Sequence, residues 1–396
     1  MGQFAVFLVG YTLSQFYRSF FAVIAPDLAR ELSLSSSDLG TISAAWFAVF
    51  ALAQIPVGVA LDRLGPRRTI ATMLVVGALG AALLGRAHSA LECTVAMGLI
   101  GAGCSPVYMG ALYVFGRSYA PHRFALLSSW LIALGSMGNL LAATPLALAS
   151  AHMGWRNAFL AIAAMTLGAA VVSALLVRDP PPAATDGAHA GGHWLAELWR
   201  IVSIPALWPL FPLMLVSYAI PVAERGLWIG PFLTDVWGLG AVERGHTALL
   251  MGAAMSAGAL AYGPLDHWLG TRKWVVFVGC TVTGLALMAL SLAGKPSVAT
   301  ATALLAVVGF AGLSYAVLMA HARPLFPDHL LGRGITFANL LFIGGAGLIQ
   351  PLSGRYMDSL KASGVHVVDA YARLHWAFAV AMLAATAIYA FSREKR

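Results

Sequence analysis

The chain reads Gly58-Val-Ala-Leu-Asp62-Arg63-Leu-Gly65-Pro-Arg67-Arg68 between two long apolar stretches. Glycine has no Cβ, so Gly58 allows close helix packing and Gly65 permits a tight turn. Asp62 can accept hydrogen bonds at a helix terminus. Two basic residues, Arg67 and Arg68, favour the anionic cytoplasmic face of a membrane. The segment predicts a charged loop between two membrane spans, which either sets the orientation of the chain or latches a conformation.

Composition places the whole chain in lipid. Of its 396 residues, 60% are hydrophobic and only 10% are charged, whereas soluble domains carry roughly a quarter charged residues. The net charge of +8 arises from basic residues in short loops, a pattern that orients membrane proteins and does not indicate nucleic-acid binding. The length accommodates about a dozen spans of about 20 residues each and leaves no room for a separate soluble domain.

Apolar stretches bounded by charged residues or by Pro and Gly predict twelve membrane-spanning helices. They lie approximately at residues 4–26, 38–61, 69–87, 92–115, 124–149, 157–177, 206–234, 246–266, 274–293, 298–320, 334–357 and 370–391. The predicted fold class is an all-α integral membrane protein.

One long polar connection divides the spans into two groups of six. It contains Pro180, Pro181 and Pro182, and it ends in a short amphipathic segment, 194–202, typical of a helix on the membrane surface. We therefore expect an N-terminal six-helix bundle at residues 1–177, a cytoplasmic linker at 178–205 and a C-terminal six-helix bundle at 206–396.

Basic residues are distributed unequally between the two sides. Of the 24 Lys and Arg residues, fourteen fall in loops on the side of the termini, eight on the opposite side and two within helices. This excess predicts cytoplasmic N- and C-termini, and the compact loops favour the inner membrane of a bacterium.

The two halves repeat each other. Four residues of the loop recur 205 positions later: Gly58, Gly65, Arg67 and Arg68 as Gly263, Gly270, Arg272 and Lys273. Four others recur 206 positions later: Arg117, Pro121, Gly138 and Pro145 as Arg323, Pro327, Gly344 and Pro351. Repeated halves that rock about a central site are the usual construction of a secondary transporter.

The loop resembles the signature of the major facilitator superfamily: a Gly, Asp-Arg, then Gly and two basic residues between helices two and three. Gly154-Trp155-Arg156 before the sixth span is similar to another segment of that family. The resemblance implies transport by alternating access and a conformational latch made by Gly58, Asp62, Arg63, Gly65, Arg67, Arg68, Asp266 and Arg272. In the second copy Asp266 stands one position early, which predicts a weaker latch there.

Ionisable residues inside spans indicate where the solute binds, because such groups are expensive in lipid and face the bundle interior. Arg18 lies in span one and Arg225 in span seven, 207 positions apart. Guanidinium groups bind carboxylate or phosphate in a bidentate manner. The pair predicts an anionic solute and is similar to the arginines of the superfamily's organic-anion and organophosphate carriers. The alternative is structural pairing, of Arg225 with Glu224 and of Arg18 with helix carbonyls.

Glu224 is the candidate proton carrier, because burial and a neighbouring arginine act on its proton affinity in opposite directions. Its alternative role is a constant partner for an arginine. The resemblance implies a site lined mainly by spans one, four, seven and ten, and polar and aromatic residues on these spans complete the predicted binding site: Tyr11, Gln15, Tyr17, Tyr108, Tyr218 and Tyr315.

Uptake of a small anion by proton symport is the function that these features favour. A proton-driven efflux pump for drugs or metabolites, an anion exchanger and a non-transporting sensor remain alternatives. No HExxH, GxSxG or Walker motif occurs in the sequence, so no enzymatic activity is expected. We expect no metal and no cofactor, a monomer in the lipid bilayer, and protons as the coupling ion.

Overall fold

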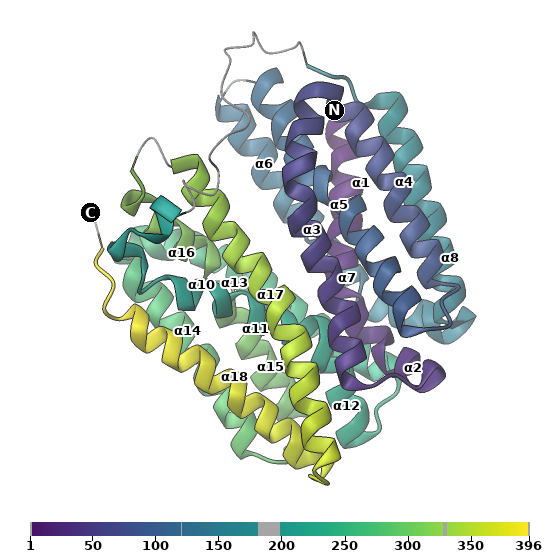
Figure 1. Ribbon diagram of the computed structural model, residues 1–396, viewed down its shortest axis with the longest axis vertical. Coiled ribbons are helices and arrows are strands. Elements are labelled where there is room, and N and C mark those ends of the chain that lie inside the picture. Colours follow the sequence, from purple (N-terminus) through teal and green to yellow (C-terminus); the bar gives the residue numbers. More distant parts are fainter. Residues whose placement is uncertain (1, 120, 181–198, 328–330, 395–396) are drawn as a thin grey trace. The chain divides into compact units, whose positions relative to one another are not determined.

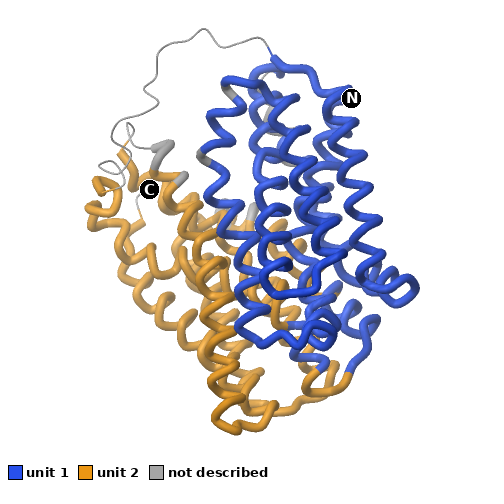
Figure 2. The backbone as a smooth tube through the Cα atoms, turned by 45° about the vertical axis from the view of Figure 1, so that its right-hand side comes forward, with its two compact units in different colours: residues 1–186, 229–234, 239–249 blue, residues 187–228, 235–238, 250–396 orange. Residues whose placement is uncertain are grey.

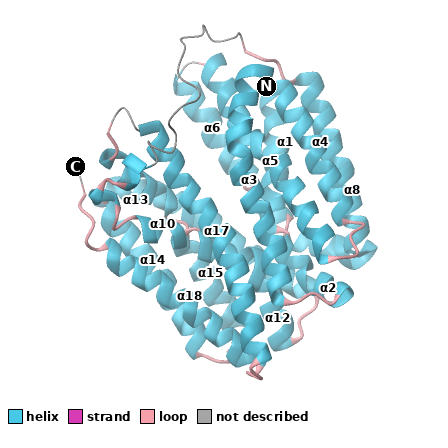
Figure 3. Ribbon diagram, viewed as in Figure 1, coloured by secondary structure: helices cyan, strands magenta, loops and turns pink. Residues whose placement is uncertain are grey.

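The computed structural model describes residues 2–119, 121–180, 199–327 and 331–394, and every regular element in them is helical (Figure 3). Of the predicted linker, residues 181–198 lie outside the described residues. Nine helical stretches of the described chain are long and apolar enough to cross a membrane. One of them, 130–176, contains two predicted spans, and spans one and eight are not among the nine stretches found in the described residues. All twelve predicted spans correspond to helices.

The first half contains predicted spans one to six (Figure 1). Its helices are α1 (Gly2–Ser19), α2 (Phe21–Leu32), α3 (Ser36–Leu64), α4 (Pro66–Leu84), α5 (Ala90–Ser118), α6 (Pro121–Gly135), α7 (Met137–Leu141) and α8 (Thr144–Leu176). Spans five and six meet within α8 at Gly154, whose φ of 79° is outside the helical region. Glycine adopts such a φ without steric cost.

The second half contains predicted spans seven to twelve. Its elements are η1 (Pro205–Leu207), α10 (Phe211–Ser217), α11 (Ala219–Ala223), η2 (Glu224–Trp228), α12 (Ile229–Trp237), α13 (Ala241–Leu269), α14 (Arg272–Leu292), α15 (Val298–Gly312), α16 (Tyr315–Ala322), η3 (Arg323–Leu325), α17 (Leu331–Ala362) and α18 (Val367–Tyr389). Span seven is thus made of five short elements, from η1 to α12, and η2 is a π-helical turn.

Side-chain caps define several helix starts. Ser35 and Asp38 form a capping box at the start of α3, in which Ser35 Oγ accepts from the Asp38 N–H and Asp38 accepts from the Ser35 N–H. Ser89, Thr271 and Ser297 cap α5, α14 and α15. These contacts satisfy amide groups that have no partner within the helix.

Small residues let neighbouring helices approach closely. A methyl group at Gly103 of α5 would lie 2.4 Å from the Cα of Gly77 on α4. The two backbones are therefore in direct contact, as is usual where helices pack in lipid through small residues.

The chain forms two compact units, shown in blue and orange in Figure 2. Unit 1 contains residues 1–186 together with 229–234 and 239–249. Unit 2 contains residues 187–228, 235–238 and 250–396. The end of span seven and the start of span eight therefore pack with the first half of the chain.

Candidate solute-binding site

One face of α1 carries three of the predicted site residues of unit 1. Tyr11, Gln15 and Arg18 are spaced by four and then three positions, so their side chains share a helix face. The ring of Tyr11 lies 5.2 Å from that of Tyr108 on α5. Gln15 is buried, and its Oε1 atom accepts no hydrogen bond from a described residue.

The Arg18 guanidinium lies over aromatic rings of α3. Its Cζ is 5.1 Å from the ring centroid of Trp46 and 5.4 Å from that of Phe50. The electron-rich faces of these rings attract the cation without neutralising it. Arg18 therefore keeps its positive charge in a half-buried environment, with donors suited to a carboxylate.

Tyr17 belongs to the packing between helices. It is 2% exposed, and its hydroxyl bonds with Thr166 Oγ1 on α8 at 2.8 Å. The same side chain packs edge-on against Phe16 and Phe20. These contacts account for Tyr17 without a ligand.

Unit 2 carries a matching aromatic pair. The ring of Tyr218 lies 5.3 Å from that of Tyr315, and these two tyrosines stand 207 positions after Tyr11 and Tyr108. Arg225 has the same offset from Arg18. Each half therefore presents one tyrosine pair and one arginine at corresponding positions.

Arg225 lies in the π-helical turn η2 and is only 4% exposed. Its Nη2 and Nε atoms lie 2.7 and 2.9 Å from the position that a Cβ would occupy on Gly252 of α13. Glycine at this position is what leaves room for the guanidinium. Single π-turns within α-helices occur frequently at functional sites.

Glu224, the preceding residue, approaches a histidine from the last span. Its Oε1 lies 3.5 Å from Nε2 of His375 on α18, and both side chains are fully buried. Neither carboxylate oxygen accepts a hydrogen bond from a described residue. An acid and a base in direct contact inside a low-dielectric interior can hold or exchange a proton.

Two further hydrogen bonds enclose this turn. Trp228 donates from Nε1 to Ser353 Oγ of α17 at 2.9 Å. Tyr371, one turn before His375 on α18, donates to Asp235 Oδ2 at 2.7 Å. The first bond ties the end of η2 to α17, and the second ties α12 to α18.

The sequence prediction missed His375, Tyr371 and Asp235. An ionisable residue within a predicted span was the available signal for His375. Nothing in the one-dimensional pattern pairs it with Glu224, because that contact joins the seventh and twelfth spans.

The loop between α3 and α4 contacts the end of α8 in unit 1. Gly65 has a φ of 81°, which confirms the predicted tight turn. The backbone N–H of Arg67 donates to Asp179 Oδ1 at 2.8 Å, and Arg67 Nε donates to the carbonyl of Ala174.

The other predicted latch residues of this loop are Gly58, Asp62, Arg63 and Arg68. Arg63 and Arg68 are exposed, and the Asp62 side chain lies outside the described residues. A side chain at Gly58 would meet no atom within 4 Å, so the expected close packing there is wrong.

The second copy of the loop is held in a similar way in unit 2. The backbone N–H of Arg272 donates to Glu394 Oε1 at 2.6 Å, and Thr271 Oγ1 donates to Glu394 Oε2 at 2.7 Å. These bonds outweigh the effect of partial burial and leave the pKa of Glu394 below its usual value. Gly270 also turns the chain, with a φ of 63°. The Asp266 side chain lies outside the described residues.

The two units thus share one arrangement. In each half of the chain, an acidic residue after the sixth span caps the helix of the third span. Asp179 follows span six and Glu394 follows span twelve. The carboxylates lie where the helix dipole is positive, a favourable placement for negative charge.

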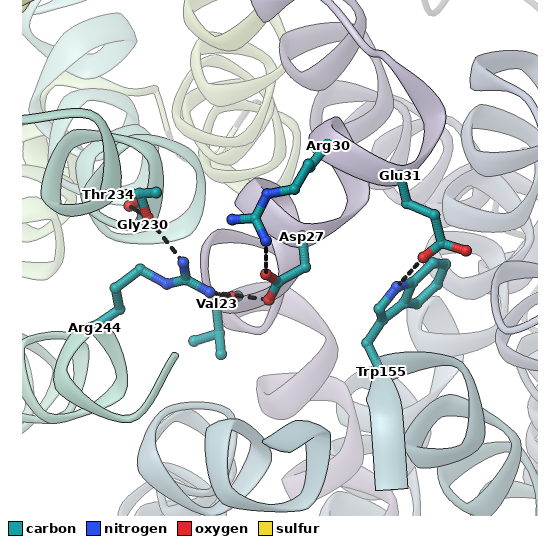
Figure 4. Close-up of polar contacts among 8 residues, drawn as sticks. All are labelled: Val23, Asp27, Arg30, Glu31, Trp155, Gly230, Thr234 and Arg244. Atoms are coloured by element: carbon teal, nitrogen blue, oxygen red, sulfur yellow. Dashed lines mark hydrogen bonds and ion pairs between the residues drawn. The ribbon is translucent and has the colours of Figure 1, made fainter. Parts of the chain in front are cut away.

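A second polar cluster lies at the other end of unit 1 (Figure 4). Arg244 of α13 is buried and donates to Asp27 Oδ2 at 2.9 Å, to Thr234 Oγ1 at 2.8 Å and to the carbonyl of Val23 at 3.4 Å. A methyl at Gly230 of α12 would lie 1.7 Å from the carbonyl of Ala22, so the backbones of α12 and α2 are in contact. These contacts explain why segments 229–234 and 239–249 pack with the first half.

The Gly-Trp-Arg segment is part of the same unit. Trp155 Nε1 donates to Glu31 Oε2 at 2.7 Å, and Arg156 Nε donates to Glu31 Oε1 at 2.9 Å. Arg156 Nη1 also donates to the carbonyl of Ala87 at 2.7 Å. The segment therefore anchors the connection between spans five and six to α2. In the described part of the chain, no three His, Cys, Asp or Glu side chains are grouped to hold a metal.

Comparison with known proteins places this arrangement in a family. The model of the Major Facilitator Superfamily matches residues 7–351. Monocarboxylate transporter 11 of Homo sapiens is 30% identical over 359 residues, which cover 84% of this chain and 72% of that protein. The gentisate transporter of Corynebacterium glutamicum is 26% identical over 365 residues, covering 88% and 78%.

Solved structures show the same fold. The crystal structure of a bacterial homologue to the human lysosomal transporter Spinster, in an inward-facing and occupied conformation, superimposes with a TM-score of 0.79. It covers 98% of this chain and 96% of that chain at 18% identity. The chain therefore belongs to the major facilitator superfamily and is a multi-pass membrane transporter of a small molecule, not an enzyme.

Proposed function

We propose that this transporter carries a small organic anion with a carboxylate group, by alternating access and coupled to protons. The observation that carries the proposal is Arg225, a guanidinium that is 4% exposed in a π-helical turn of span seven. A cation buried within a membrane span is costly, and such residues by default indicate a functional site. Arg18 supplies a second cation at the corresponding position of the first half.

The names of the relatives support a carboxylate. One relative is a monocarboxylate transporter and the other a gentisate transporter. The tyrosine pairs Tyr11–Tyr108 and Tyr218–Tyr315 add apolar surface and hydroxyl groups, which suits an anion with an apolar or ring portion.

Coupling to protons is proposed from Glu224, which lies beside Arg225 and is fully buried. The negative charge of the Glu224 carboxylate repels an anion that approaches the neighbouring Arg225. Protonation of Glu224 removes that repulsion, so proton and anion favour each other's binding. Uptake by symport follows if both are released on the cytoplasmic side.

The predicted setting is part of the proposal. We place the protein as a monomer in a bacterial inner membrane with both termini in the cytoplasm. Residues 1–177 and 206–396 serve as the two repeats, joined by the linker 178–205. The loops capped by Asp179 and Glu394 then lie on the cytoplasmic side and latch one conformation.

Reconstitution in proteoliposomes tests the function. With an acidic exterior, we expect the wild type to accumulate radiolabelled gentisate or pyruvate and to lose accumulation when a protonophore is added. Arg225→Gln removes the buried charged hydrogen bonds to the anion, which are worth about 2 kcal/mol or more, and is expected to weaken anion binding roughly 30-fold. Arg86→Gln, an exposed arginine in a loop, is the control. Unchanged binding in both Arg18→Gln and Arg225→Gln would contradict the anion site.

A further inference from the structure

The contact between Glu224 and His375 is the least expected feature of unit 2. Their atoms Oε1 and Nε2 are 3.5 Å apart, and the relative exposure of each residue is 0%. Glu224 belongs to the π-turn of span seven, whereas His375 comes from the first half of α18 in span twelve. Burying two ionisable groups away from water costs free energy unless they pair with each other or bind a ligand.

Other ionisable groups of the described residues lie near the pair in unit 2. Arg225 follows Glu224 along the chain. Tyr371 of α18 lies within electrostatic range of Glu224, and its hydroxyl donates to Asp235. Asp235 is thus engaged by Tyr371, whereas Glu224 and His375 contact each other beside Arg225.

We propose that Glu224 and His375 form a single proton-binding unit, in which His375 holds or passes on the proton that travels with the anion. The inference rests on the proposed function, and it adds a residue from span twelve to the coupling mechanism. The proton adds to a carboxylate oxygen of Glu224 or to Nε2 of His375, and no other bond forms or breaks.

Charge balance gives the reason for a pair. With Glu224 ionised and His375 neutral, the Arg225 charge is compensated. One added proton neutralises the carboxylate or charges the imidazole, and the site then carries one net positive charge. A monoanion at Arg225 removes that excess. Proton and monoanion therefore bind cooperatively, and either one alone leaves an uncompensated charge in a low-dielectric interior.

The π-turn supports this assignment independently. A π-turn inserts one extra residue into the helix and weakens the regular hydrogen bonds around it. In η2 it places Glu224 toward α18 and Arg225 against α13. The two adjacent residues therefore contact different helices from within one turn.

Transport assays separate coupling from binding. Proteoliposomes with wild type, Glu224→Gln, His375→Gln or His152→Gln would be assayed for proton-driven accumulation of radiolabelled gentisate and for gentisate counterflow without a proton gradient. His152 is exposed and serves as the matched histidine control. We expect Glu224→Gln and His375→Gln to keep counterflow and to lose accumulation by about tenfold or more.

Two results would overturn the proposal: accumulation by His375→Gln at the wild-type level, or loss of both activities by a folded His375→Gln protein. Failure of the wild type to exchange gentisate is a different result, because it counts against the proposed anion. The Glu224–His375 pair is then tested by a second measurement.

That measurement needs no substrate. Infrared difference spectra of the purified protein between pH 4 and pH 9 should contain a carboxylic C=O band that is absent in Glu224→Gln. The pH at which this band has half of its full intensity is expected to shift by about one unit or more in His375→Gln. It should not shift in His152→Gln. An unmoved midpoint in His375→Gln would show that the histidine is only structural.

Discussion

The guanidinium of Arg225 lies directly against the backbone of Gly252, with Nη2 2.7 Å from the position where a methyl group would stand. Arg225 is almost fully buried, so it cannot move into water to make room. Its position therefore depends on a residue that contributes no side-chain atom.

Gly252→Ala is expected to displace the Arg225 guanidinium and to weaken gentisate binding about 10- to 100-fold, because a shift of about 1 Å has effects of this size at a functional site. Binding to purified protein by calorimetry measures the change. Gly168→Ala on α8 is the control, since a Cβ there meets no atom within 4 Å. Equal affinities for the two variants would contradict the role of Gly252.

Tyr17→Phe should affect stability and leave transport unchanged. The substitution removes the 2.8 Å hydrogen bond to Thr166, which is worth about 1 kcal/mol in a buried site. A lower melting temperature in detergent with an unaltered KM for gentisate is the expected result. An increase in KM would instead place the Tyr17 hydroxyl in the solute site.

Arg244→Gln is expected to destabilise the protein more than Arg30→Gln does. Both arginines pair with Asp27, but the Arg244 side chain is 3% exposed with three acceptors, whereas that of Arg30 is 73% exposed and 3.9 Å away. Charge-assisted hydrogen bonds are worth about 1.5–3 kcal/mol, against about 0–1 kcal/mol for an exposed pair.

Thermal unfolding of both variants in detergent measures the difference. Similar melting temperatures would show that the cluster of Asp27, Thr234 and Arg244 does not hold segments 229–234 and 239–249 in unit 1. Asp27→Asn offers a second comparison, because it removes the same charge from both ion pairs.

Glu394→Gln should lower stability at neutral pH and have no effect in acid. The pKa of Glu394 is depressed from its usual 4.5 because hydrogen bonds from Thr271 and from the Arg272 N–H outweigh partial burial. Such a carboxyl stabilises the fold above its unfolded pKa and loses that contribution as the pH falls through its folded value.

The difference in melting temperature between wild type and Glu394→Gln is therefore expected at pH 7 and should vanish below the depressed pKa. A difference that persists in strong acid would mean that the glutamine disturbs the cap of α14 sterically. Glu243→Gln, at an exposed position of α13, is a control for charge alone.

Composition, periodicity and internal repetition were enough to predict the twelve helices, and the family was predicted from the resemblance of the loop Gly58–Arg68 to a known signature. Lipid imposes this directly, because every span must be about 20 apolar residues long and must satisfy its own backbone. The offset of 207 between Arg18 and Arg225 likewise identified the two arginines, and the same offset links the two tyrosine pairs.

The contacts between distant spans were beyond such reasoning. Glu224 and His375 meet because the turn η2 of span seven packs against α18, and a one-dimensional pattern contains no signal for that packing. Asp27 and Arg244 meet because α2 and α13 pack together, which also assigns residues 229–234 and 239–249 to unit 1. Helix formation is local and follows from hydrophobicity, whereas the pairing of buried charges depends on which helices pack together and in what rotation.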